Sequence, residues 1–277
     1  MIPFDIDDYL NRSSVCKNLI LSDDITTIYL NNNEILHYQW ILPNLLVIRD
    51  DLLCGGTKSR FLHKILPLNY TNYVYVSPWW GGAQIALSLA INHLNSTSHS
   101  TPKKSIIFTQ VPDGPIPAFN SVAQEFGSDI NFISGSVDDL YNAAYDFIDH
   151  NKDSILLPSG FDTPDFNTQL ATFASHIKEI FGPFDQVWSV AGSGALTRGL
   201  QKGKLGKEYF AVSVDRFLPN VGNAHLIKYP YPFNQRVSAD KYPPFPSASH
   251  YDAKAWYYAY RSALENPNKR IVFWNVM

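Results

Sequence analysis

Short runs of apolar and β-branched residues alternate along this chain with longer segments whose apolar residues recur every three or four positions. The short runs predict strands and the longer segments predict helices, because side chains repeat every second residue in a strand and about every 3.6 residues in a helix. The predicted strands are 45–48, 73–77, 105–109, 130–133, 154–157, 186–190, 208–214 and 270–274. The predicted helices are 59–66, 83–95, 120–126, 137–150, 166–181, 195–203 and 252–265. This alternation is typical of mostly parallel sheets with crossover helices, so the predicted fold class is α/β.

Two stretches depart from this alternation. Residues 96–104 are polar and rich in Ser and Thr, which indicates an exposed loop rather than an interdomain linker. Residues 219–249 carry many Pro, Tyr, Phe and Asn residues with weak periodicity. They predict a long loop region with short elements, and a loop of that length inside a domain is usually functional, for example by closing over a ligand.

Composition narrows the class of protein. The chain has 277 residues, of which 45% are hydrophobic, enough for one large domain or two modest ones. Its net charge of -3, without a basic block, argues against nucleic acid or an anionic membrane as partner. The most apolar stretch, 74–94, is interrupted by Pro and Gly-Gly and predicts no membrane span.

Two further features favour a reducing cytoplasm. The N-terminal residues are acidic where a secretory signal would carry Lys or Arg, so no export is expected. The two cysteines, Cys16 and Cys54, provide neither a disulfide framework nor a metal cluster. The histidines are scattered without metal-ligand spacing, so we assign no metal.

A lysine follows a glycine turn at the end of the first predicted strand. The segment reads Gly55-Gly56-Thr57-Lys58-Ser59, which predicts a turn and a helix start with Lys58 in its first turn. A cation at a helix N-terminus opposes the dipole unless it is neutral, as in an imine, or faces an anion. Lys58 is therefore a candidate for binding a cofactor, the alternative being a surface lysine after a turn.

A second glycine turn follows the predicted strand 186–190. It reads Gly192-Ser193-Gly194-Ala195-Leu196 and runs into a predicted helix. Such turns direct backbone N–H groups at an anion, and the helix dipole adds to the attraction. The Lys-Ser/Thr ending of a nucleotide P-loop is missing, so the expected ligand is a monophosphate. The alternative is that glycine serves only the geometry of the turn.

Taken together, these segments resemble the fold-type II pyridoxal 5'-phosphate (PLP) enzymes. The likeness is greatest to the branch that contains 1-aminocyclopropane-1-carboxylate deaminase and D-cysteine desulfhydrase. Residues 49–60 resemble the family's Arg-Glu/Asp-Asp-Leu and Gly-Gly-Asn-Lys-x-Arg motif, with Thr57 in place of Asn. Four further segments follow in the family's order, namely 120–130, 156–162, 192–196 and 250–255. The resemblance implies that Lys58 is the Schiff-base lysine and that residues 192–196 hold the cofactor phosphate.

The resemblance also implies roles for Tyr251 and Asp252. The matching tyrosine of the deaminase branch lies near the substrate, and the acid after it faces the pyridine nitrogen. An aspartate there keeps that nitrogen protonated and strengthens the ring as an electron sink. The alternatives are a packed aromatic residue for Tyr251 and a helix-capping or first-turn acid for Asp252.

The chain departs from the family where the substrate carboxylate is expected to bind. The family has Gln-Ser-Asn-His or a close variant there, whereas this chain has Trp79-Trp80-Gly81-Gly82-Ala83-Gln84. Backbone N–H groups of Gly81 and Gly82 and the side chain of Gln84 are candidate donors to a carboxylate. Trp80, with its neighbour Trp79, either walls the substrate pocket or packs in the core. Ser77, at a strand's C-terminal end, is a further candidate for a polar contact.

The predicted architecture has two three-layer α/β/α domains with the cofactor in the cleft between them. A large PLP-binding domain comprises residues 1–60 and 156–277, and a small domain comprises 61–155. The predicted function is a PLP-dependent lyase or deaminase that acts at the α-carbon of a small amino acid. One alternative is a PLP enzyme for a bulkier amine or amino acid conjugate, with decarboxylation included, and another is a non-catalytic binding protein. The resemblance implies a homodimer.

Overall fold

The computed structural model describes residues 25–277 except for 31–33, 98–100 and 215–217. Contacts divide the chain into two compact units. One consists of the described residues up to Leu53 together with Asp162–Met277, and the other of Cys54–Phe161. We call them the seven-stranded unit and the four-stranded unit after their sheets.

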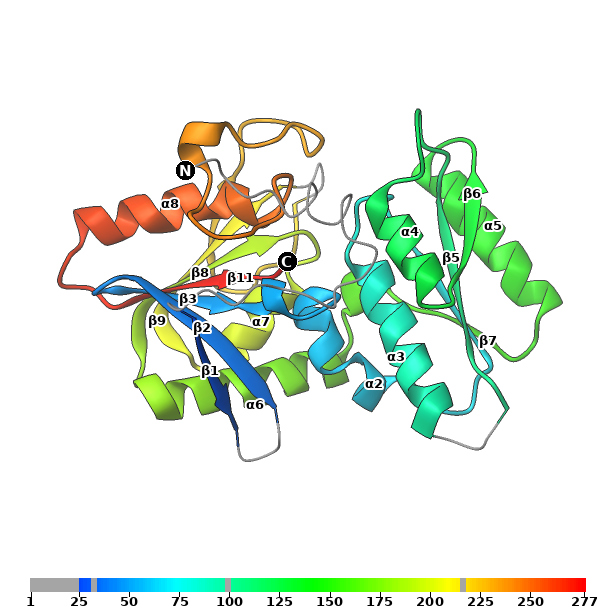
Figure 1. Ribbon diagram of the computed structural model, residues 1–277, viewed down its shortest axis with the longest axis horizontal. Coiled ribbons are helices and arrows are strands. Elements are labelled where there is room, and N and C mark those ends of the chain that lie inside the picture. Colours follow the sequence, from blue (N-terminus) through cyan, green and yellow to red (C-terminus); the bar gives the residue numbers. More distant parts are fainter. Residues whose placement is uncertain (1–24, 31–33, 98–100, 215–217) are drawn as a thin grey trace. The chain divides into compact units, whose positions relative to one another are not determined.

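The seven-stranded unit is built on a mixed sheet in the order β1-β2-β3-β11-β8-β9-β10 (Figure 1). Strands β1, β2 and β3 pair antiparallel, and every pairing from β3 to β10 is parallel. The bounds are β1 Thr26–Tyr29, β2 Ile35–Leu42, β3 Leu45–Arg49, β8 Phe184–Ala191, β9 Gly206–Ser213, β10 His225–Lys228 and β11 Ile271–Asn275. Strands β3 and β11 are buried along their whole lengths, as expected for central parallel strands covered on both faces.

Helices cover both faces of this sheet. Helix α8 (Asp252–Glu265) lies on one side, and α6 (Pro164–Phe181) lies on the other, where it packs on α7 (Ala195–Lys202) (Figure 1). Two short 3-10 helices, η2 (Asp50–Leu52) and η5 (Ala239–Lys241), lie in the connections. Helix α6 begins with the Thr163 hydroxyl accepting the N–H of Phe166 and with Pro164 at its first position, a combination that favours helix initiation.

The four-stranded unit contains a parallel sheet in the order β6-β5-β4-β7. Its strands are β4 Asn72–Val76, β5 Lys104–Gln110, β6 Asp129–Ile133 and β7 Ser154–Leu156. Its helices are α2 Leu62–Ile65, α3 Ala83–Thr97, α4 Ala118–Glu125 and α5 Val137–His150, with the 3-10 helices η3 Gly56–Arg60 and η4 Ser159–Phe161. A capping box between Ser136 and Asp139 starts α5.

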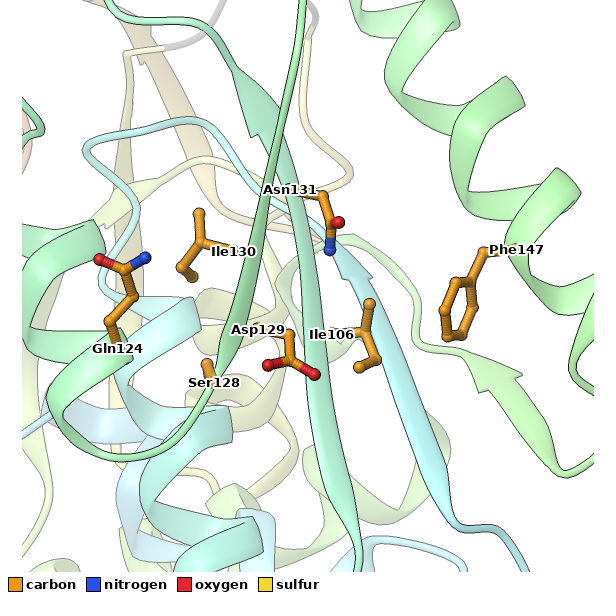
Figure 2. Close-up of a pocket in the computed structure, with 7 residues that line it drawn as sticks. All are labelled: Ile106, Gln124, Ser128, Asp129, Ile130, Asn131 and Phe147. Atoms are coloured by element: carbon orange, nitrogen blue, oxygen red, sulfur yellow. The ribbon is translucent and has the colours of Figure 1, made fainter.

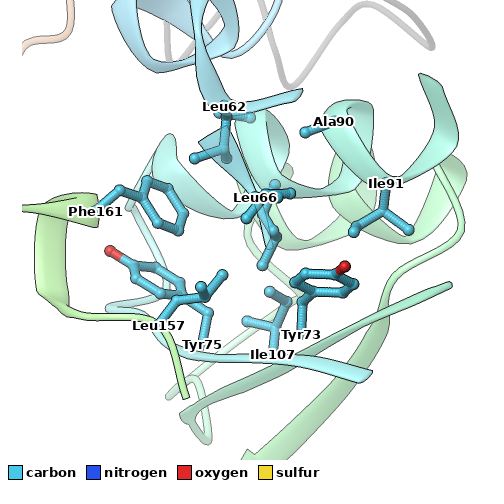
Figure 3. Close-up of a cluster of buried hydrophobic side chains, with 11 residues drawn as sticks. Leu62, Leu66, Tyr73, Tyr75, Ala90, Ile91, Ile107, Leu157 and Phe161 are labelled. Atoms are coloured by element: carbon cyan, nitrogen blue, oxygen red, sulfur yellow. The ribbon is translucent and has the colours of Figure 1, made fainter. Parts of the chain in front are cut away.

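Successive side chains of β4 and β5 point to opposite faces of this sheet and build two cores. Val74 and Phe108 join Leu140 of α5 in one cluster. Tyr75 and Ile107 join residues of α2 and α3 in the other, which Figure 3 shows. In that cluster the Tyr75 ring stacks on Phe161 at 4.6 Å between centroids. The period of two that predicts each strand therefore also separates the two cores.

The predicted α/β class is confirmed, and each predicted strand and helix has a counterpart in the structure. The predicted long loop, 219–249, contains only the short elements β10 and η5. In the part of the chain that the structure describes, the strands β1, β2 and β10 have no counterpart in the sequence-based prediction. The predicted helix 59–66 is wrong in its first turn, because residues 56–60 form the 3-10 helix η3. Phe61, with a φ of -125°, separates η3 from α2.

Some predictions fall outside the described residues. These are the N-terminal segment to which we assign no export signal, Cys16, and residues 98–100 of the polar loop. Among the described residues, no helix combines the length and apolar character needed to cross a bilayer.

Candidate active site

The second glycine turn lies at the C-terminal end of β8, where ligands of parallel α/β sheets bind. Gly192 donates its N–H to the Tyr251 hydroxyl at 3.1 Å. The N–H groups of Ser193 and Gly194 form no hydrogen bond within the described residues. Two backbone donors at the start of α7 are thus available to an anion, and no acidic side chain lies in the first turn of that helix to repel it.

Gly194 cannot be replaced without moving the turn. Its φ is +83°, a conformation that residues with a Cβ seldom adopt. A Cβ there would also lie 2.1 Å from the carbonyl oxygen of Asn220. The Arg198 guanidinium donates to that same oxygen and forms an ion pair with Asp162. The turn is therefore fixed both by conformation and by the segment that crosses it.

A buried hydroxyl next to the turn supports a polar ligand. Ser213 ends β9 and pairs with Ala191, the last residue of β8. It is 1% exposed, and its Oγ has no hydrogen-bond partner in the part of the chain that the structure describes. A buried hydroxyl without a partner is costly, so such a group commonly marks a site for an absent ligand or water. Together with the two available N–H groups, Ser213 makes the end of β8 and β9 a suitable place for a phosphate.

Tyr251 and Asp252 stand at the start of α8. The Tyr251 hydroxyl contacts the glycine turn through Gly192, and Asp252 is completely buried. One carboxylate oxygen of Asp252 accepts the N–H of Met277 at 3.0 Å. The structure thus brings Tyr251 to the second glycine turn, residues 192–196, which we call the phosphate turn after its predicted ligand. The predicted contact of Asp252 with a pyridine nitrogen stays a prediction.

Lys58 lies in the four-stranded unit, inside the 3-10 helix η3 and not in the first turn of an α-helix. The helix dipole invoked for Lys58 is therefore weaker than the sequence suggests, because η3 has only five residues and ends before α2. The residue before η3 is Gly55, which has a left-handed conformation with a φ of +80°. A Cβ on Gly55 would lie 2.9 Å from the backbone of Ala86. The turn that carries Lys58 is consequently packed directly on the first turns of α3.

The loop before α3 carries the predicted substrate contacts. Gly81 donates its N–H to Pro78 O at 2.9 Å and so closes a tight turn, whereas the N–H of Gly82 forms no hydrogen bond within the described residues. Ser77 is buried, and its hydroxyl donates to Pro78 O at 3.0 Å. Of these predicted donors, Gly82 retains an N–H for a ligand.

Gln84 is completely buried beneath this loop. Its amide nitrogen donates to Trp79 O at 3.2 Å, and its amide oxygen accepts from Asn120 of α4 at 2.7 Å. Both ends of the side chain are thus engaged in holding the loop on the helix pair. A direct contact of Gln84 with substrate would require one of these hydrogen bonds to break.

Trp79 and Trp80 are both partly exposed and lie against each other, with ring centroids 4.8 Å apart. Neither ring belongs to the two apolar clusters described above. The role of Trp80 in walling a substrate pocket stays a prediction.

A cavity of about 420 Å³ lies elsewhere in the four-stranded unit, around the start of β6. Figure 2 shows its lining, which includes Gln124, Asp129 and Phe147. None of the predicted site residues contributes to it. Among the described residues, no group of three or more His, Cys, Asp or Glu side chains is arranged to hold a metal ion.

The sequence gives no sign that Ser213 or Lys254 contributes to a site. Ser213 gives no signal, since a serine at the end of a strand is common. Lys254 lies in the segment 250–255 that resembles a family motif, but only its burial marks it out. A buried lysine cannot be distinguished from an exposed one by periodicity alone.

No family model matches the sequence, and no curated protein matches it either. Solved structures do match. An ACC deaminase homologue superposes with a TM-score of 0.69 at 15% identity, covering 84% of this chain and 83% of that chain. Cysteine synthase from Entamoeba histolytica gives 0.63 at 15% identity, covering 95% and 89%. Threonine deaminase isoform 2 from Solanum lycopersicum gives 0.62 at 14% identity, covering 84% and 74%.

The chain has the fold of these proteins, the fold-type II architecture of PLP-dependent enzymes. The resemblance inferred from the motifs is thereby confirmed at the level of the fold. Identities of 14 to 15% carry no chemistry from one protein to another, because a fold hosts many functions.

Proposed function

We propose that this protein is a PLP-dependent enzyme that acts at the α-carbon of a small amino acid, by deamination or β-elimination. The observation that carries the proposal is the glycine turn at the end of β8, where two backbone N–H groups and the buried Ser213 hydroxyl lie without partners among the described residues. This donor set suits a phosphate monoester. The fold and the motif around Lys58 support PLP as the molecule that carries it.

PLP, when bound, supplies an electron sink that stabilises negative charge at the substrate α-carbon. Residues of this chain would do the rest. The amine of Lys58 would attach the cofactor, be released when the amino acid binds, and take and return the α-proton. Asp252 would hold a proton on the ring nitrogen, since a buried carboxylate favours a cation beside it.

Tyr251 would act on the substrate beyond the α-carbon, as an acid, base or nucleophile. Its hydroxyl already lies 3.1 Å from Gly192 N in the phosphate turn, which supports a position beside the cofactor. Gly82 N–H, with Gly81 and Gln84 shaping the loop around it, would bind the substrate carboxylate.

The proposal includes a homodimer in the cytoplasm, and light scattering of the purified protein measures the dimer.

Adding PLP to the purified protein tests the cofactor. After unbound PLP is removed, we expect the protein to keep an absorbance band near the visible edge that disappears on borohydride reduction, with mass spectrometry placing the reduced adduct on Lys58. Lys58→Ala should abolish both, whereas Lys64→Ala, at an exposed lysine in the adjacent helix α2, should change neither. A protein that is colourless once the excess PLP has been removed contradicts the proposal.

Incubation with small amino acids tests the reaction. The expected products are ammonia and a keto acid, with sulfide in addition from cysteine. A protein that binds PLP on Lys58 but turns over none of these substrates would leave the cofactor assignment in place and remove the deaminase and desulfhydrase reactions. The non-catalytic alternative predicts that Lys58→Ala leaves the biological activity of the protein intact.

A second candidate, a bulkier amine or amino acid conjugate as substrate, is favoured by the Trp79 and Trp80 pair. These rings stand, partly exposed, where the family has small polar residues. Aromatic faces bind apolar or aromatic groups better than they bind a short side chain. Absorbance changes of the PLP-loaded protein on adding aromatic or conjugated amino acids, with Trp80→Ser as the matched variant, separate the two candidates.

A further inference from the structure

Lys254 is completely buried in the seven-stranded unit. Its ammonium group donates to Pro232 O at 3.1 Å and to Phe233 O at 2.9 Å. The same group lies 4.9 Å from the centroid of the Tyr229 ring and 5.3 Å from that of Phe233. All four contacts are made with one stretch of the long loop, residues 229–233, which we call the aromatic turn.

No carboxylate pairs with this ammonium group among the described residues. Burial alone lowers the pKa of Lys254 from its ordinary value to about 8. A buried cation without a counter-ion is costly, so it persists where carbonyl dipoles and aromatic faces replace the lost water. Lys254 therefore attaches a loop with few elements of its own to helix α8, and each attachment point is a main-chain or ring atom of that loop.

The aromatic turn in turn contacts the candidate active site. The Phe233 ring lies 6.4 Å from the Tyr251 ring and 6.3 Å from that of His250, between centroids. The Tyr251 hydroxyl accepts the N–H of Gly192 at the start of the phosphate turn. A continuous set of contacts thus runs from Lys254 through Phe233 and Tyr251 to Gly192, within one unit of the chain.

We propose that Lys254 is a positioning residue: it holds the aromatic turn on α8 and, through the Phe233 ring, fixes the Tyr251 hydroxyl against the phosphate turn. The catalytic importance of this arrangement rests on the proposed function, in which Tyr251 acts on the substrate. The positioning itself does not, because amide hydrogen exchange detects it without cofactor or turnover. A failure of one is therefore distinguishable from a failure of the other.

Amide hydrogen exchange of the whole chain, resolved to single residues, tests the proposal. Two amides report on it. Gln235 N–H donates to Pro232 O at 3.1 Å and reports on the aromatic turn, and Gly192 N–H reports on Tyr251. Lys254→Met keeps a long apolar stem but removes the donors and the charge. We expect it to accelerate exchange at least tenfold at both amides.

Lys241→Met is the matched control in the same loop. Lys241 also lies over an aromatic ring, at 5.0 Å from the Tyr257 centroid, but it donates no hydrogen bond to the aromatic turn. In Lys241→Met, the amides of Gln235 and Gly192 should exchange as fast as in the wild type. Ile177→Ala, at a buried position on α6, controls for general loss of stability. If Ile177→Ala accelerates both amides as much as Lys254→Met does at equal stability, the proposal is overturned.

Two further variants resolve the steps and remain informative if Lys254→Met fails to fold. Phe233→Leu keeps the carbonyl acceptors of Lys254 but removes the ring, so Gly192 should exchange faster while Gln235 stays protected. Tyr251→Phe should likewise accelerate Gly192 alone. Unchanged exchange at Gly192 in Phe233→Leu, with acceleration in Tyr251→Phe, would show that Lys254 has no effect on Tyr251 through this ring.

Discussion

Gly194 illustrates how one residue determines the geometry of the candidate site. Its positive φ and the carbonyl of Asn220 directly opposite both exclude a side chain. The first constraint alone costs about 1–2 kcal/mol for an L-residue. The second forces the backbone of the turn, or of the segment containing Asn220, to move.

Gly194→Ala should therefore lower the free energy of unfolding by more than about 2 kcal/mol, because strain and steric overlap act together. Affinity for PLP should fall as well. Denaturant unfolding and a PLP titration measure the two effects. Gly127→Ala is the matched control, since Gly127 has a φ of +87° but no atom within 4 Å of the added Cβ. Its cost should be about 1–2 kcal/mol, the cost of the positive φ alone. Equal losses in the two variants would contradict the steric argument.

Lys254 gives a pH-dependent prediction. The pKa of Lys254 is about 8 in the folded chain and 10.5 for the ordinary group, so between these values the unfolded chain binds more protons. Stability rises with pH wherever that holds. With respect to Lys254, the free energy of unfolding is therefore highest above pH 10.5, and this part of it is lost as the pH falls towards 8. Burial raises the pKa of the neighbouring Tyr229, which stays neutral over most of this range.

We expect the unfolding free energy of the wild type, measured relative to Lys254→Met, to increase between pH 8 and 10.5. The comparison removes the effect of other titrating groups common to both proteins, including Tyr73 and Tyr75. Burial raises the pKa of each of these tyrosines to about 12. Urea unfolding at several pH values provides the measurement. A constant difference over this range would mean that burial does not depress the pKa of Lys254.

At the scale of elements, a buried ion pair joins several segments around the end of β3. The Arg49 guanidinium donates to both carboxylate oxygens of Asp51, at 2.8 and 2.7 Å, and to Gln39 of β2 at 2.6 Å. It also lies 4.8 Å from the centroid of the Phe245 ring, in the long loop. Bidentate geometry of this kind is the strongest form of the interaction.

Asp51→Ala should cost about 3–5 kcal/mol of unfolding free energy, because it leaves the Arg49 charge buried without its carboxylate. The double variant Arg49→Met, Asp51→Leu should be the more stable of the two, since neither member of the pair is left buried without its partner. Glu265→Ala breaks the exposed Arg261–Glu265 pair and should cost at most about 1 kcal/mol. Chemical denaturation of the three proteins tests the order, and a double variant less stable than Asp51→Ala would contradict it.

The strands that the sequence predicts and those that it does not predict differ in how far they are buried. Strands buried on both faces, such as 45–49 and 271–275, appear as continuous apolar runs and were predicted. Strands β1, β2 and β10 lie at or near the sheet edges, are only partly buried, and mix polar with apolar residues. Their pairing partners, and not their own patterns, make them strands.

At the scale of the whole molecule, the two units differ in how the chain forms them. Within the described residues, the four-stranded unit is one continuous segment, Cys54–Phe161, with its own sheet and the two apolar clusters given above. The seven-stranded unit combines segments from both sides of it, and its strand β11 is hydrogen-bonded to β3 on one side and β8 on the other.

A fragment of residues 54–161 should therefore fold by itself, because all four strands and the helices that cover them lie within it. A fragment of residues 162–277 should not, since without β3 the buried strand β11 becomes an exposed edge. Circular dichroism with cooperative thermal unfolding distinguishes the two outcomes. A cooperatively folded 162–277 fragment would show that β1, β2 and β3 are dispensable for the larger sheet.

The amino-acid sequence alone determined the α/β class, the central strands and most helices, because hydrophobic periodicity is a local property of the chain. It also identified the two glycine turns, since a backbone that must adopt a positive φ needs glycine wherever it folds. Only the tertiary structure decided that η3 replaces the first turn of a helix at Lys58 and that the Tyr251 hydroxyl contacts Gly192, 59 residues away. It also decided that Lys254 is buried and holds the aromatic turn. These features depend on which distant segments pack together, and no local pattern encodes that.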